Sequence, residues 1–169
     1  MIAAKERSLP PREAKAWQKE GKMSIGLLLA DDSNVARHAI RRLLEEEPNI
    51  ELVAEAVCFA DVIRMAAELK PDVVLIDLHM RDEREFDPAS TKSHLLGCAK
   101  RILAMSVWVD GVSRALAADY GAAKLLDKSR LASELIPAIV QGRLTTTLFP
   151  DSGRIGRHYL RASAKFRST

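Results

Sequence analysis

Residues 25–32 read IGLLLADD, and this stretch sets the pattern that the middle of the chain repeats. A short apolar run without alternation is typical of a strand that is covered on both faces. Similar runs, each ending in a polar residue, are DVVLID at 72–77, ILAMS at 102–106 and AKLLD at 123–127. The segment ELVAEA at 51–56 alternates, which predicts a strand nearer the edge of a sheet.

Amphipathic segments lie between these runs and predict helices. The first follows Ser33, a residue type that caps helix N-termini, and it ends before Pro48. Its predicted buried stripe consists of Val35, Ala39, Ile40, Leu43 and Leu44. Further helices are expected at 60–69, 93–101, 111–120 and 130–142, with a polar loop at 79–92. Alternating strands and helices predict an α/β fold, in which a parallel sheet carries helices on both faces.

Two residues are expected to shape individual helices. Gly121 follows the helix at 111–120, where a glycine serves as a C-terminal cap. Pro137 lies inside the last helix and removes one backbone hydrogen bond. We expect a kink or a restart of the helix there.

Charge divides the chain into three parts. Residues 1–22 carry a net charge of +3, residues 23–142 carry −5 and residues 143–169 carry +5. The middle part is long enough for one domain, and the outer parts read as a flexible basic arm and a flexible basic tail. Met23 is a second candidate for the first residue of the protein.

Hydropathy and cysteine usage favour a cytoplasmic protein. The N-terminus has no apolar segment of the secretory type, and no apolar run is long enough to span a membrane. Cys58 and Cys98 are far apart in the sequence and are predicted to be buried, reduced thiols.

Five polar residues follow the predicted strands directly. They are Asp31, Asp32, Asp77, Ser106 and Lys128. The carboxyl ends of parallel strands share one edge of the sheet, where ligands bind in open α/β folds. Clustered carboxylates require a cation such as Mg²⁺, and a lysine and a hydroxyl suit the oxygens of a phosphoryl group. An aspartate in such a site can attack phosphorus and form an acyl phosphate.

Four longer motifs give the chain a resemblance to the receiver domains of two-component response regulators. They are LLLADDSNVARHAIRRLL, PDVVLIDLHM, ILAMSVW and GAAKLLDKS. The resemblance covers residues 24–142, and its pattern is most similar to receivers of LuxR-type regulators. It implies a CheY-like, flavodoxin-like (βα)5 fold with strand order 2-1-3-4-5.

The resemblance also implies roles for the acidic residues. Asp77 would be the phosphoacceptor. Mg²⁺ would be bound directly by Asp32, Asp77 and the backbone carbonyl of His79, and through water by Asp31. Ser106 would be the hydroxyl that moves toward the phosphoryl group. Lys128 would pair with Asp77, or with the phosphoryl group once it is present.

Several positions depart from the family pattern. Arg81 stands where a proline is usual, and Ser129 stands where many members have a cis-proline, as in the LuxR-type subset. Leu125 replaces the aromatic residue of strand five that reports activation in many receivers, and Val107 is bulkier than the usual Ala or Gly. Only residues 143–169 follow the last predicted helix. This is too few for a helix-turn-helix, so we expect a receiver without a DNA-binding output domain.

The favoured function is a phosphorylation switch rather than an enzyme, with slow loss of its own phosphoryl group as its only reaction. A histidine kinase or phosphotransfer protein would phosphorylate it, and it would signal by protein contact, with its oligomeric state left open. One alternative is a phosphorylation-independent adaptor, and another is a regulator that touches nucleic acid weakly through its basic tails. A dehalogenase-type phosphatase is disfavoured, because it needs a second acid where His79 stands.

Overall fold

The computed structural model describes residues 24–146, with side chains as far as residue 141. Five parallel strands form one sheet in the order β2-β1-β3-β4-β5, which confirms the predicted fold and strand order. The strands are β1 Ile25–Ala30, β2 Ile50–Ala56, β3 Val73–Asp77, β4 Arg101–Ser106 and β5 Lys124–Asp127. Most of the predicted basic arm and basic tail lies outside the described residues.

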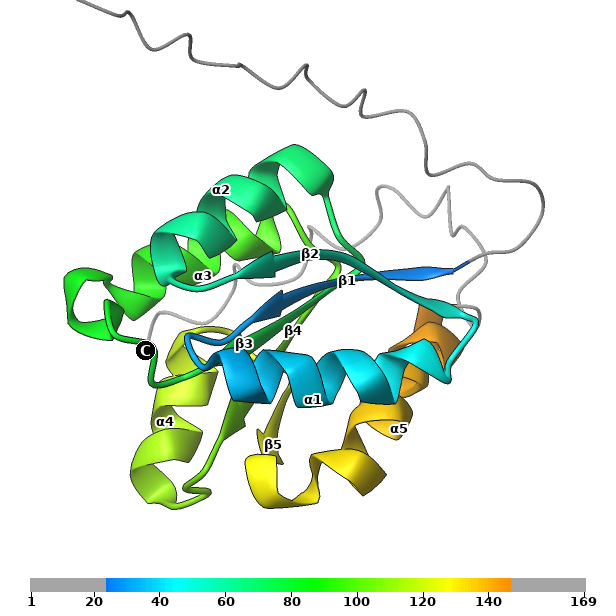
Figure 1. Ribbon diagram of the computed structural model, residues 1–169. Helices are drawn as coiled ribbons and strands as arrows, with labels where there is room; N and C mark the ends of the chain where they lie inside the picture. Colours follow the sequence, from blue (N-terminus) through cyan, green and yellow to red (C-terminus); the bar gives the residue numbers. More distant parts are fainter. Residues whose placement is uncertain (1–23, 147–169) are drawn as a thin grey trace, which may run out of the picture.

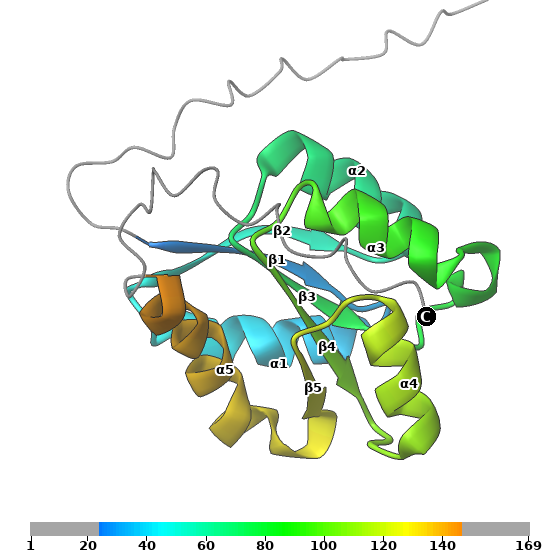
Figure 2. The same cartoon turned by 180° about the vertical axis from the view of Figure 1, so that it is seen from behind.

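Helices cover both faces of the sheet (Figures 1 and 2). They are α1 Asn34–Glu45, α2 Phe59–Leu69, α3 Pro88–Leu96, α4 Gly111–Asp119 and α5 Leu131–Thr146. Two short 3-10 turns, η1 Glu83–Glu85 and η2 Lys128–Arg130, precede α3 and α5. Since α5 ends at Thr146, it extends beyond the predicted end at residue 142.

The apolar strands divide their side chains between two cores, because successive residues of a strand point to opposite faces. Leu28 and Ile76 face α2, α3 and α4, in a core that also holds Phe59 and Tyr120. Leu27, Leu29, Leu75 and Leu103 belong to the opposite core, under α1 and α5. Both faces of the central strands are therefore buried, which is why their sequences are uninterrupted apolar runs.

The buried stripe of α1 is narrower than predicted. Ile40 and Leu44 are buried and Leu43 is partly buried, as expected. Val35 is 80% exposed and Ala39 is also exposed. Val35 lies in the first helical turn, which follows β1 at the carboxyl edge of the sheet, where no strand extends far enough to cover it.

The sequence predicts a loop over the whole of 79–92, but the last part of this segment is helical. Helix α3 begins at Pro88 rather than at residue 93 and ends at Leu96 rather than at 101. The Asp87 side chain caps it by accepting a hydrogen bond of 2.8 Å from the backbone N–H of Ser90. A capping aspartate followed by proline at the first helical position is a helix start, and the polar composition of the segment obscured it.

Pro137 does not restart α5, which continues through it as one helix. Proline leaves one backbone carbonyl of the preceding turn without its usual partner, and Pro137 lies on the exposed side, where water can satisfy that group. The guanidinium of Arg101 donates hydrogen bonds to the carbonyls of Ala138 and Ile139 and fastens α5 to β4. Gly121 has a φ of +76° just after α4, in agreement with its predicted capping position.

Candidate functional site

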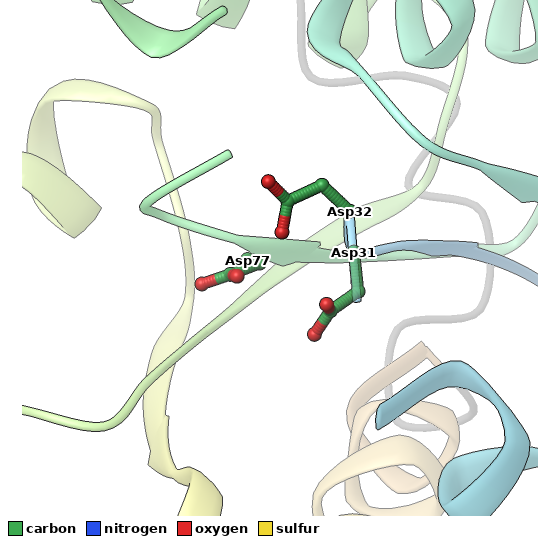
Figure 3. A group of neighbouring side chains, drawn as sticks. All are labelled: Asp31, Asp32 and Asp77. Atoms are coloured by element: carbon green, nitrogen blue, oxygen red, sulfur yellow. The ribbon is translucent and has the colours of Figure 1, made fainter. Parts of the chain in front are cut away.

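Three carboxylates meet at the carboxyl edge of the sheet (Figure 3). Asp31 and Asp32 follow β1, and Asp77 is the last residue of the neighbouring strand β3. One carboxylate oxygen from each residue lies within 4.8 Å of the other two. Asp31 is fully buried and Asp77 is 5% exposed, whereas Asp32 is half-buried. The structure therefore brings together the acidic residues that the sequence placed at this edge.

Lys128 bridges the two buried carboxylates. Its Nζ donates hydrogen bonds of 2.7 Å to Asp31 Oδ2 and of 2.7 Å to Asp77 Oδ2. Burial alone would lower the pKa of Lys128, but the hydrogen bonds to Asp31 and Asp77 outweigh it and the pKa is raised. Burial raises the pKa of Asp77, with Lys128 opposing that change. Asp77 is therefore a more basic carboxylate than an exposed one, held beside a charged ammonium.

Backbone groups and one arginine hold the carboxylates in place. The N–H of Ser33 donates to Asp31 Oδ1 at 2.8 Å, and the N–H of His79 donates to Asp77 Oδ1 at 3.2 Å. The guanidinium of Arg37 donates to the carbonyl oxygen of Asp31 at 2.7 Å and to Glu55 at 3.2 Å. These partners keep the Arg37 side chain largely buried.

Ser106 is the last residue of β4 and is fully buried. Asp77 pairs with Met105 across the two strands, so Ser106 is one residue further along β4 than the partner of Asp77. Its Oγ accepts a hydrogen bond of 3.1 Å from the backbone N–H of Trp108. Among the hydrogen bonds of the described residues, none joins Ser106 to the three carboxylates.

Two aromatic side chains, from the segments that follow Asp77 and Ser106, contact each other. The rings of His79 and Trp108 meet edge to face with centroids 5.7 Å apart, and His79 Nδ1 lies 3.1 Å from Glu83 Oε2. Trp108 and its neighbour Val107 are each 63% exposed. The contact of His79 with Trp108 depends on two loops that only the fold brings together.

Arg81 pairs with the remaining carboxylate, since its Nε lies 3.3 Å from Asp32 Oδ2. The next residue, Asp82, accepts hydrogen bonds of 2.8 Å and 3.1 Å from the N–H of Phe59 and so caps α2 from a distant loop. Neither contact was predicted. The arginine at position 81, where a proline is usual, was a sequence signal that could have indicated the contact with Asp32. The local sequence held no signal for the Asp82 cap on α2.

The donor set suits a hard divalent cation. Three carboxylates supply oxygen ligands, and Mg²⁺ is bound in proteins by a few such oxygens while it keeps several waters. Lys128 offsets one of the three negative charges from within the site. The residues that would hold the ion are Asp31, Asp32 and Asp77, an acidic trio typical of magnesium sites in receivers.

Residues 27–140 match the response regulator receiver domain model. The chain belongs to this family. Receivers are phosphoacceptor switches in two-component signalling rather than conventional enzymes, and the acidic pocket of this chain is of their kind.

Relatives with longer chains share this receiver. The transcriptional regulatory protein LiaR of Bacillus subtilis is 31% identical over 115 residues, which are 68% of this chain and 54% of LiaR. The response regulator GacA of Pseudomonas aeruginosa is 41% identical over 56 residues, which are 33% of this chain and 26% of GacA. The chain therefore spans about half or less of the length of these curated relatives.

Solved receivers have the same fold. A LuxR-family response regulator from Aurantimonas superposes with a TM-score of 0.62 at 28% identity, covering 73% of this chain and 86% of its own. The receiver of NarL from Mycobacterium tuberculosis superposes with a TM-score of 0.59 at 22% identity, covering 78% and 98%. The predicted similarity to LuxR-type receivers is thus confirmed. Among the described residues, no helix has the length and apolar character needed to cross a membrane.

Both cysteines are free thiols, but each is only half-buried, where burial had been predicted. Cys58 precedes α2, and its Sγ donates to Asp61 Oδ2 at 3.4 Å. Cys98 lies just after α3, within reach of the Lys70 ammonium at 3.6 Å. Neither thiol contacts the acidic site.

Proposed function

We propose that the protein is a receiver that accepts one phosphoryl group on Asp77 from a phosphohistidine of a kinase or phosphotransfer protein. One observation carries the proposal: Lys128 Nζ lies 2.7 Å from Asp77 Oδ2, at the point where a basic, nearly buried carboxylate needs a cation. A phosphoryl group added at that oxygen places its own oxygens within reach of the same ammonium.

The transfer joins Asp77 to phosphorus and frees the donor imidazole. An Asp77 oxygen attacks phosphorus, the bond from phosphorus to the donor nitrogen breaks, and that nitrogen retains the electron pair and takes up a proton. The N–H of His79, 3.2 Å from Asp77 Oδ1, orients the carboxylate. When bound by Asp31, Asp32 and Asp77, with the His79 carbonyl as a further ligand, Mg²⁺ would offset the negative charge that gathers during transfer.

Ser106 is proposed as the hydroxyl that responds to the new group. It lies buried at the end of β4, next to the strand that carries Asp77. Among the described residues, its Oγ accepts a hydrogen bond from the Trp108 N–H and donates none, so the O–H remains available as a donor. Output through a partner protein is our proposed route. It would not use rotation of an aromatic residue in strand five, because Leu125 stands at that position.

Acetyl phosphate tests the acceptor assignment. Wild-type protein incubated with acetyl phosphate and Mg²⁺ should gain the mass of one phosphoryl group, and the label should disappear when Mg²⁺ is chelated beforehand. Asp77→Asn should gain none, whereas Asp72→Asn, a matched aspartate at the opposite end of β3, should be labelled as wild type is. An unlabelled wild type, or a label that persists in Asp77→Asn, contradicts the proposal.

A phosphorylation-independent adaptor remains the second candidate. The exposed Val107 and Trp108 favour it, because apolar groups at the mouth of the site can contact a partner directly. Binding of a partner that is equally strong for wild type and Asp77→Asn, with and without acetyl phosphate, would establish the adaptor function. The predicted weak contact with nucleic acid involves tails that lie outside the described residues.

A further inference from the structure

The three carboxylates of the site form ion pairs with two different cationic side chains. Lys128 contacts Asp31 and Asp77, each at 2.7 Å, and leaves Asp32 to Arg81 at 3.3 Å. The two cations differ in their surroundings, since the side chain of Lys128 is 17% exposed and that of Arg81 is 83% exposed. One cation is thus built into the site, and the other reaches it from solvent.

The backbone on both sides of Arg81 is fixed, although its side chain is free. Met80 is 2% exposed and packs in the core with Phe59. Asp82 caps α2 through the N–H groups of Phe59, at 2.8 Å, and of Ala60, at 3.4 Å. These two anchors fix the Arg81 backbone near Asp32, so rotation of the Arg81 side chain alone can bring the guanidinium to that carboxylate or move it away.

We infer that Arg81 is a tethered competitor for the divalent cation, which displaces it from Asp32 on binding. The inference rests on the proposed metal site. A divalent ion at Asp32 needs carboxylate oxygen that the guanidinium now holds, and the two positive charges repel one another at this separation. Arg81 therefore lowers the affinity for Mg²⁺ and raises the concentration at which the receiver becomes competent for phosphorylation.

The strength of this competition follows from the exposure of the pair. A single hydrogen bond between an exposed arginine and a carboxylate is weak, and salt screens it further. Removal of the guanidinium should therefore tighten Mg²⁺ binding by at most about fivefold at low ionic strength, with less effect in high salt. A larger change would need a buried pair, which this is not.

Arg81→Gln tests the inference, with Arg84→Gln as the matched control. Arg84 is exposed in the same segment, and among the hydrogen bonds of the described residues it makes none with the three carboxylates. Both variants remove one positive charge, but only Arg81→Gln empties the position beside Asp32. Arg81→Glu adds a carboxylate there and should bind Mg²⁺ more tightly still.

The affinity for Mg²⁺ can be measured from the rise in the free energy of unfolding as MgCl₂ is added at constant ionic strength. A ligand that binds the folded state stabilises it by an amount that depends on the ligand concentration relative to Kd. We expect tighter binding in Arg81→Gln and Arg81→Glu, wild-type affinity in Arg84→Gln, and a smaller difference in high salt. If Arg81→Gln and Arg84→Gln bind Mg²⁺ equally, the competition is refuted while the metal site stands. If Mg²⁺ stabilises neither wild type nor Arg81→Gln, the metal site itself is refuted, and the competition with it.

Discussion

Lys128 Nζ donates hydrogen bonds of equal length, 2.7 Å, to carboxylate oxygens of Asp31 and Asp77. The two aspartates end neighbouring strands, whereas Lys128 follows β5, which β4 separates from β3. One long side chain thus crosses the end of a strand and ties three parts of the sheet edge together. This ammonium holds the site together, and its removal should change both the stability and the chemistry of the protein.

Lys128→Met should destabilise the protein by about 3 kcal/mol or more, because it leaves two buried carboxylates without their cation. Added Mg²⁺ should recover part of the loss, since the ion can neutralise the same carboxylates. Urea unfolding with and without MgCl₂ measures both effects. Lys124→Met, an exposed lysine of β5, is the control and should change stability by less than about 0.5 kcal/mol. A loss for Lys128→Met that is no greater than for Lys124→Met would show that the carboxylates do not depend on Lys128.

Asp77→Asn should stabilise the fold by about 1 kcal/mol at neutral pH, because burial disfavours the Asp77 carboxylate while Lys128 keeps Asp31 as a partner. The raised pKa of Asp77 means that the folded state retains this proton to higher pH than the unfolded chain does. Stability therefore falls as pH rises from the ordinary aspartate pKa through the raised one. The difference in free energy of unfolding between Asp77→Asn and wild type should vanish below the ordinary aspartate pKa. Urea unfolding across this pH range measures it. A gain that is constant with pH would contradict the raised pKa.

Tyr120→Phe should be neutral or stabilising at neutral pH, by up to about 1 kcal/mol, because the hydroxyl is fully buried and has no hydrogen-bond partner among the described residues. Its ring stacks on Phe59 with centroids 5.2 Å apart, and phenylalanine preserves that contact. Burial, with the nearby charges of Glu83, Asp82 and Asp87, raises the pKa of Tyr120 to about 12.

The same hydroxyl gives a second, alkaline test. Above pH 10 the unfolded chain loses the tyrosine proton while the folded protein keeps it, so wild-type stability falls as pH rises toward the raised value. The advantage of Tyr120→Phe should therefore grow by up to about 1.4 kcal/mol per pH unit in this window. Thermal unfolding of both proteins between neutral pH and pH 11 measures it. An advantage that stays constant or shrinks in alkali would contradict the raised pKa of Tyr120.

Asp82→Ala should cost about 1 kcal/mol, because it removes the carboxylate that caps α2 through the N–H of Phe59. Cys58, at the N-cap position itself, supplies no side-chain hydrogen bond to the helix. Asp82→Asn keeps an accepting oxygen and should cost much less, whereas Glu85→Ala, three residues further on, should be near neutral. Urea unfolding compares the three variants. Equal costs for Ala and Asn at this position would argue against capping.

Most of the fold was predictable because its signals are local. Uninterrupted apolar runs such as IGLLLA mark strands that are covered on both faces, and their alternation with helices leaves few arrangements open. The errors have two different origins. The start of α3 was missed because Asp87 and Pro88 sit in a polar stretch, and the exposure of Val35 depends on where the sheet ends beneath α1.

The sequence by itself determined which groups reach the carboxyl edge, since a strand that ends in aspartate in a parallel sheet places that aspartate there. It therefore predicted that Asp31, Asp32 and Asp77 lie together with Lys128 nearby, although the roles of these residues remain proposals. The tertiary structure alone decided how the charges are shared. Lys128 serves two carboxylates and Arg81 the third, because these pairings depend on side-chain reach and on loops anchored from distant elements, such as the Asp82 cap on α2. Such contacts join residues far apart in the chain, and no local pattern encodes their distance.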